Sequence, residues 1–283
     1  MTGLKKITRR PYSTDTVKKS KTVAIIGSGG MLGSDLVAFL SESFQVTGIK
    51  RENYDRNIGK RFDIVINANG NSKRFWANEY PLEDFKLSTE SVYRSVFDFS
   101  CGLYIYISSS DVYLRHDLPK FTREEQKINS ARLSAYGFNK YLAEQIIKHY
   151  CPRYIILRSA MILGRHLKKG PFFDVQNKQK LYISRESRLQ LITTQKIAGV
   201  IRQLLILKKN NAVYNLGGAG AFPMSKLTDY FSGVNFREDA ETQVYDMNVR
   251  KLKKIYPLKT SEEYLQDYVK LLNMAENDSD GKV

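Results

Sequence analysis

The chain has 283 residues, of which 42% are hydrophobic and 26% charged, a composition typical of a globular protein. Its two cysteines exclude a disulfide scaffold or a Cys-rich metal site, and no apolar run is long enough to span a bilayer. We therefore expect a cytoplasmic protein without a metal site or a membrane partner.

The net charge of +16 is partly local. Residues 1–21 hold seven basic residues against one acidic residue, and Pro11 interrupts any helix there. We interpret this segment as a flexible basic N-terminal extension. The remaining excess favours attraction of an anionic small-molecule substrate or cofactor. A nucleic-acid contact is the less favoured interpretation.

Apolar runs at strand spacing alternate with helical patterns along most of the chain. The predicted strands cover residues 22–26, 44–50, 63–69, 103–109, 154–163 and 212–216, and the main predicted helices cover residues 88–99, 131–150 and 191–207. This alternation predicts an α/β fold, a Rossmann-type doubly wound parallel sheet. We expect the dinucleotide-binding domain over residues 22–164 and a smaller C-terminal substrate domain over residues 165–283, interleaved with the first.

A glycine-rich turn lies directly between the first strand and the helix that follows it. Gly27, Gly30 and Gly33 are spaced G-x-x-G-x-x-G. Such a turn needs residues without side chains, so that the backbone approaches a pyrophosphate and the helix packs close to the strand. The helix start then favours the phosphates. We expect a dinucleotide here, with Met31 and Leu32 also in contact.

The end of the second strand suggests which dinucleotide binds. An acidic residue at this point binds the ribose 2′-hydroxyl of NAD. Here Lys50 and Arg51 stand instead, and two cations suit a 2′-phosphate. The sequence therefore favours NADP over NAD.

Tyr136 and Lys140 are four residues apart, on one face of a predicted helix. A nearby ammonium lowers the tyrosine pKa from about 10 by about 1–3 units, which makes the pair a usable acid/base. Ser109 ends the fourth predicted strand, where its hydroxyl would hydrogen-bond the substrate oxygen.

Over residues 22–164 these motifs resemble the extended short-chain dehydrogenase/reductase family, in its NAD-dependent epimerase/dehydratase branch. Further stretches resemble that branch at residues 63–68 (DIVINA), 108–113 (SSSDVY), 157–164 (LRSAMILG) and 213–218 (VYNLGG). The resemblance implies Tyr136 as catalytic acid/base, Lys140 as its partner and Ser109 as the catalytic serine. Candidate cofactor contacts further include Asn67, Ala68, Asn69, Ser108, Tyr136 and Lys140, and candidate substrate contacts are Ser110, Asp111, Met161 and Arg165.

Two departures narrow the function. Met161 replaces an asparagine that contacts substrate phosphate in many nucleotide-sugar enzymes of this branch, and Ser110 replaces the acid of the 4,6-dehydratases. We favour a ketoreductase acting on a sugar or nucleotide-linked sugar, and the alternative is an NAD-dependent sugar epimerase using the same residues. A non-catalytic regulatory or nucleic-acid-binding protein on this fold is the third interpretation. A homodimer is implied by the resemblance alone.

Overall fold

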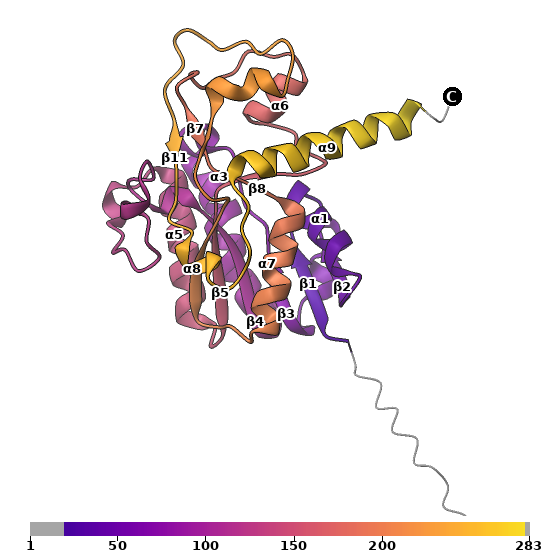
Figure 1. Ribbon diagram of the computed structural model, residues 1–283. Coiled ribbons are helices and arrows are strands. Elements are labelled where there is room, and N and C mark those ends of the chain that lie inside the picture. Colours follow the sequence, from indigo (N-terminus) through magenta and orange to yellow (C-terminus); the bar gives the residue numbers. More distant parts are fainter. Residues whose placement is uncertain (1–19, 281–283) are drawn as a thin grey trace, which may run out of the picture.

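The computed structural model describes residues 20–280 (Figure 1). Residues 1–19, which make up most of the expected basic extension, lie outside the described residues.

A six-stranded sheet in the order β2-β1-β3-β4-β5-β9 forms the centre of the fold, and every neighbouring pair in it is parallel. Its strands are β1 (Thr22–Ile26), β2 (Gln45–Ile49), β3 (Arg61–Asn67), β4 (Ser100–Ser109), β5 (Tyr154–Ser159) and β9 (Ala212–Leu216). Strands β2 and β3 lie on opposite sides of β1, so the connections that follow β1 and β2 run in opposite directions across the sheet. Such a change of direction creates a crevice at the carboxyl ends of β1 and β3.

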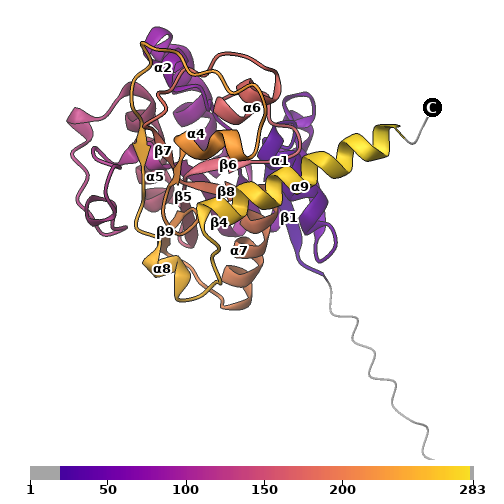
Figure 2. The same ribbon diagram turned by 45° about the horizontal axis from the view of Figure 1, so that its top comes forward.

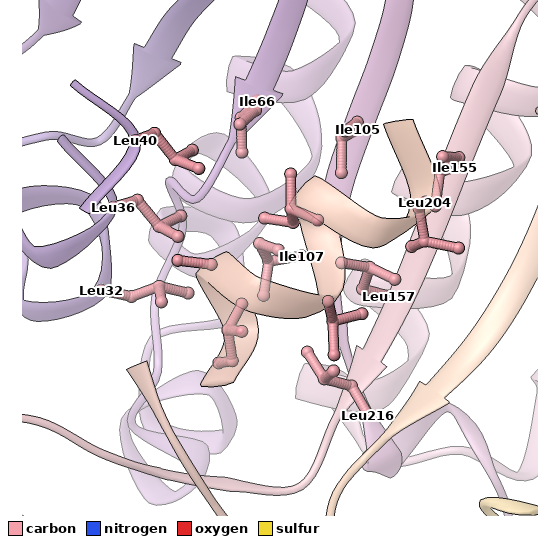
Figure 3. Packing of buried hydrophobic residues seen from close by; sticks show 14 of the residues in the cluster. Leu32, Leu36, Leu40, Ile66, Ile105, Ile107, Ile155, Leu157, Leu204 and Leu216 are labelled. Carbon is pink, nitrogen blue, oxygen red and sulfur yellow. The ribbon is translucent and has the colours of Figure 1, made fainter. Parts of the chain in front are cut away.

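Helices cover both faces of this sheet. On one face lie α1 (Met31–Leu40) and α7 (Thr194–Ile206), and on the other lie α4 (Ser91–Asp98) and α5 (Ala135–Tyr150). Figure 3 shows the first core, in which leucines of α1 and Leu204 of α7 pack on isoleucines of the strands. Because side chains alternate along a strand, Ile105 faces this core while Tyr104 and Tyr106 face the apolar layer under α4 and α5, on the opposite side of the sheet.

A second, smaller core lies at the carboxyl end of the strands (Figures 1 and 2). Phe172, Leu189 and Phe222 are among its buried members. Its elements are β6 (Met161–Leu163) paired with β8 (Leu191–Thr193), α6 (Pro171–Gln176), the sheet β10-β7-β11 (Phe222–Pro223, Arg188–Leu189 and Val244–Tyr245) and α9 (Ser261–Asp280). The short helices α2 (Arg74–Glu79), α3 (Pro81–Phe85) and α8 (Arg250–Lys253) complete the fold.

The predicted α/β fold and the six predicted strands are confirmed, but several boundaries are wrong. Strand β3 spans Arg61–Asn67 instead of 63–69, β4 begins at Ser100 instead of residue 103, and α4 begins at Ser91 instead of residue 88. Residues 154–163 are two strands, because the amide of Ala160 still bonds to Leu216 whereas that of Met161 bonds to Gln190 in the second core. The predicted helix over 191–207 starts only at Thr194, after strand β8.

The predicted helix over 131–150 also begins late, at Ala135. The hydroxyl of Ser134 accepts the amide N–H of Gly137 and caps the helix there. This cap fixes the turn of α5 that carries Tyr136.

None of the helices in residues 20–280 is long and apolar enough to cross a membrane.

Candidate active site

Four segments from distant parts of the sequence meet at the carboxyl end of the sheet. They are the glycine turn after β1, the loop after β3, a 3-10 turn after β4 (Ser110–Val112) and the start of α5. Parallel strands end on one edge, so this edge collects whatever follows each strand.

The glycine turn has the geometry of a phosphate cradle. Gly27 has a φ of +84°, and a Cβ on Gly33 would lie 2.1 Å from the carbonyl oxygen of Gly27. Helix α1 has no side-chain cap, so the amides of its first turn are available to an anion. The hydroxyl of Ser28 in the same turn is buried and has no hydrogen-bond partner among the described residues. These features fit a bound dinucleotide, with Met31 and Leu32 in the first turn of α1.

Lys50 and Arg51 lie beside this turn. The Cγ and Cδ of Lys50 are 3.8 Å from the position of a Cβ on Gly29, and both cationic side chains are exposed. Asn53 fixes the local backbone by accepting the amide of Lys50 at 2.7 Å and donating to the carbonyl of Gly48 at 3.0 Å. The two cations are therefore held at the side of the cradle.

The predicted catalytic set converges. The start of α5 packs so closely on the turn after β4 that a Cβ on Gly137 would lie 2.2 Å from the carbonyl oxygen of Asp111. This packing places the Tyr136 side chain beside Ser109, whose hydroxyl donates to Asp111. The Nζ of Lys140 is 6.0 Å from the centre of the Tyr136 ring, and both side chains are buried.

The pKa of Tyr136 differs from expectation. Burial raises it well above its ordinary value, the charge of Asp111 raises it further, and the hydrogen bond with Ser109 only partly opposes this. The expectation that Lys140 lowers the pKa of Tyr136 is therefore wrong for this geometry, because burial disfavours both charged forms. Burial likewise lowers the pKa of Lys140 to about 8, against an opposing effect of Asp84. At neutral pH Tyr136 holds its proton and is suited to donate it.

The loop after β3 encloses the lysine. Gly70 has a φ of +127°, and a Cβ there would lie 2.9 Å from the Nζ of Lys140. Beyond it, the fully buried carboxylate of Asp84 accepts hydrogen bonds from Asn71 at 2.9 Å and Asn139 at 2.7 Å. Sequence reasoning missed Asp84, since nothing in the segment around it marks a buried carboxylate.

Asp111 connects Ser109 to the second core. It accepts hydrogen bonds from the hydroxyl of Ser109 at 2.8 Å and from that of Tyr245, in β11, at 3.1 Å. Arg74 forms an ion pair with Asp111 at 3.5 Å, and its guanidinium lies 4.6 Å from the centre of the Tyr245 ring. Sequence reasoning found Asp111 but missed Arg74 and Tyr245, which reach it from 37 and 134 residues away only through the tertiary fold.

The side chains of two other candidates, Asn67 and Ser108, form hydrogen bonds within the fold. The amide of Asn67 is fully buried and bonds to Tyr104 at 2.8 Å, and the hydroxyl of Ser108 bonds to Glu144 at 2.7 Å. A cofactor contact from either residue would have to use the backbone.

The remaining candidates lie around the crevice. Ala68 and Asn69 follow β3, Ser110 is buried in the turn after β4, Met161 lies in β6, and Arg165 is exposed after that strand.

Within residues 20–280, no group of three or more His, Cys, Asp or Glu side chains is arranged to hold a metal ion.

Residues 23–185 match the model of the NAD dependent epimerase/dehydratase family. The chain belongs to this family. No curated protein sequence matches it significantly.

Solved structures share the fold of this family member at low sequence identity. The dTDP-4-dehydrorhamnose reductase of Bacillus anthracis in complex with NADP is 15% identical with a TM-score of 0.72, covering 88% of this chain and 97% of that one. The UDP-glucose 4-epimerase of Thermotoga maritima with UDP-glucose is 17% identical with a TM-score of 0.69, covering 90% and 99%. At these identities the likeness extends to the fold and not to the reaction.

Proposed function

We propose that this chain is an NADP-dependent ketoreductase acting on a sugar or nucleotide-linked sugar. The observation that carries the proposal is the buried Tyr136 beside Ser109 and Lys140, on the same edge of the sheet as a glycine turn shaped for a dinucleotide. Reduction of a ketone needs a proton donor next to the new alkoxide, and a tyrosine that keeps its proton supplies one.

In this proposal each residue has a distinct role. The bound cofactor would supply a hydride to the carbonyl carbon. Tyr136 donates its proton to the developing alkoxide oxygen. Ser109 would orient that oxygen by turning its hydroxyl, which donates to Asp111 in this structure, toward the substrate. Lys140 would hold the nicotinamide ribose of the bound cofactor.

The choice of NADP rests on Lys50 and Arg51. Both are exposed beside the glycine turn, where a 2′-phosphate of the adenosine ribose would meet them. The structurally similar proteins do not separate the cofactors, because they include complexes with NADP and with NAD.

An epimerase would use the same three residues, and structural likeness includes epimerases as well as reductases. A reductase consumes NADPH, however, and Lys50 and Arg51 at the end of the second strand suit the 2′-phosphate of NADP. The reductase is therefore the better fit.

Calorimetric titration with NADPH and NADH tests the cofactor, and NADPH consumption tests the reaction. We expect tight NADPH binding and weak NADH binding. Tyr136→Phe should lower turnover by roughly 10²–10⁴ without loss of NADPH binding. Tyr150→Phe, at the exposed end of the same helix, is the matched control. Binding of neither nucleotide to a nucleotide-free sample would refute the proposal.

A homodimer is also proposed, through α4 and α5. Tyr93, Phe97 and Tyr150 of these helices are exposed, and their ring centres are 5.0–5.7 Å apart, in two T-shaped pairs and one tilted pair. Aromatic side chains are enriched at interfaces. Light scattering of the purified protein would give the mass, and a monomer at high concentration would contradict this arrangement.

A further inference from the structure

Four cationic side chains surround the loop after β3. Lys140 lies against Gly70, the ammonium of Lys169 donates a hydrogen bond to the hydroxyl of Ser72, and Lys73 and Arg74 follow in the chain. Lys169 comes from the segment between β6 and α6, so this contact joins the second core to the sheet.

The charges of this group are only partly compensated. Arg74 is paired with Asp111, and the charge of Asp84 favours the charged form of Lys140. Lys73 and Lys169 form no ion pair with any carboxylate whose side chain the structure describes. Burial, followed by repulsion from Lys73 and Lys140, lowers the pKa of Lys169 to about 8. Like charges held together without a counter-ion disfavour their own charged form, and a bound anion removes that penalty.

The position of this group relative to the catalytic residues limits where the anion lies. Lys140 contacts the loop at residue 70 and Lys169 contacts it at residue 72. Two residues span at most about 7 Å. The Nζ of Lys140 is in turn 6.0 Å from the centre of the Tyr136 ring, so Lys169 and Tyr136 can contact different groups of one substrate molecule.

We propose that Lys169, Ser72 and Lys73 bind an acid group of the substrate, a carboxylate or a phosphate. This inference rests on the proposed function for the identity of the reacting carbon. It assigns to these three residues the recognition of an anionic keto sugar. The ammonium of Lys169 and the hydroxyl of Ser72 would both donate to the anion, and a charge-assisted hydrogen bond is stronger than a neutral one.

The test measures the ammonium signals of isotope-labelled lysines by NMR in protein free of nucleotide, with inorganic phosphate and malonate as probes. The signal of Lys169 is assigned by its loss in Lys169→Gln. We expect one of the probes to raise the pKa of Lys169, since an anion favours the charged form. Lys169→Gln, followed through the signals of the neighbouring Lys73 and Lys140, should weaken that probe by about 10- to 100-fold, as expected for loss of one charge-assisted hydrogen bond. The probe that binds more tightly identifies the acid group.

Lys168→Gln is the matched control, because it removes the neighbouring, exposed lysine and the same charge. We expect it to leave probe binding unchanged, whereas Ser72→Ala should weaken the probe without altering the net charge. Three results would overturn the inference: a Lys169 signal that neither probe moves, an equal loss in Lys168→Gln, or displacement of the probe by NADPH, which would assign these cations to the cofactor. The measurement needs neither cofactor nor turnover, so it stays readable if the chain proves not to be a reductase.

Discussion

Replacing Glu144 by glutamine removes the charge that compensates a buried arginine. The side chains of Arg158 and Glu144 are 2% and 0% exposed. The guanidinium donates from Nε at 2.9 Å and from Nη2 at 2.7 Å to the two carboxylate oxygens. The pair fixes α5, which carries Tyr136 and Lys140 on its preceding turns, to strand β5 of the sheet.

Two estimates of the cost agree. Breaking a buried ion pair by removing one partner costs about 3–5 kcal/mol, because the other charge remains buried. In terms of hydrogen bonds, glutamine keeps one acceptor oxygen, so one bond to a charged group worth about 1.5–3 kcal/mol is lost, and the guanidinium N–H left buried without a partner costs about another 1–3 kcal/mol. We therefore expect Glu144→Gln to lower the free energy of unfolding by about 3–5 kcal/mol, measured by urea unfolding followed by tyrosine and tryptophan fluorescence.

An exposed pair provides the control. Glu42 contacts Arg202 at 3.5 Å, but its side chain is 72% exposed. Water screens such a pair, so Glu42→Gln should change stability by less than about 1 kcal/mol. The double variant Glu144→Leu, Arg158→Met should recover much of the loss by removing both charges. A cost below about 1 kcal/mol for Glu144→Gln would refute the argument, because it would mean that water reaches the pair.

Four further outcomes follow from the site and the core. Replacing Lys50 and Arg51 together by alanine should weaken the binding of NADPH by about 10- to 100-fold in calorimetry and leave the binding of NADH unchanged. Each charge-assisted contact to the 2′-phosphate is worth about 1.5–3 kcal/mol. Equal losses of affinity for both nucleotides would contradict the assignment. Gly33→Ala should abolish nucleotide binding while circular dichroism stays native-like, because the new Cβ meets the Gly27 carbonyl oxygen at 2.1 Å. Lys140→Met should stabilise the nucleotide-free protein at pH 7 by up to about 3 kcal/mol, because the buried lysine, with its pKa lowered to about 8, is still charged there. The gain should shrink between pH 8 and 10, as the wild-type lysine loses its proton. A gain independent of pH would show that the lysine is not charged when buried. Leu36→Ala should cost about 2–5 kcal/mol in urea unfolding through the cavity it leaves, and a loss under 1 kcal/mol would mean that the core closes around it.

The sequence predicted those parts of the fold and the site that depend on neighbours along the chain. Apolar β-branched runs marked the strands of the central sheet, and the spacing of Gly27, Gly30 and Gly33 marked the cradle. Tyr136 and Lys140 share a helix face because four residues make about one turn. None of these inferences needs a distant contact.

What the sequence did not predict depends on tertiary contacts. Arg74 and Tyr245 are unremarkable until the second core brings them to Asp111. The raised pKa of Tyr136 follows from burial, which no local pattern reports. The apolar run over residues 154–163 likewise concealed the change of hydrogen-bond partner at Met161, because both strands there are apolar.

The path of the chain between the two cores limits how the protein can be divided. Helix α7 and strand β9 belong to the first core but follow much of the second in sequence. A fragment ending at Gly164 would lack both, leaving the outer edge of β5 unpaired and the apolar face around Leu157 open to water. We expect such a fragment to aggregate rather than fold. Chimeras that exchange substrate specificity would therefore need to transplant residues 165–193 and 217–274 as separate inserts and keep α7 and β9 in place.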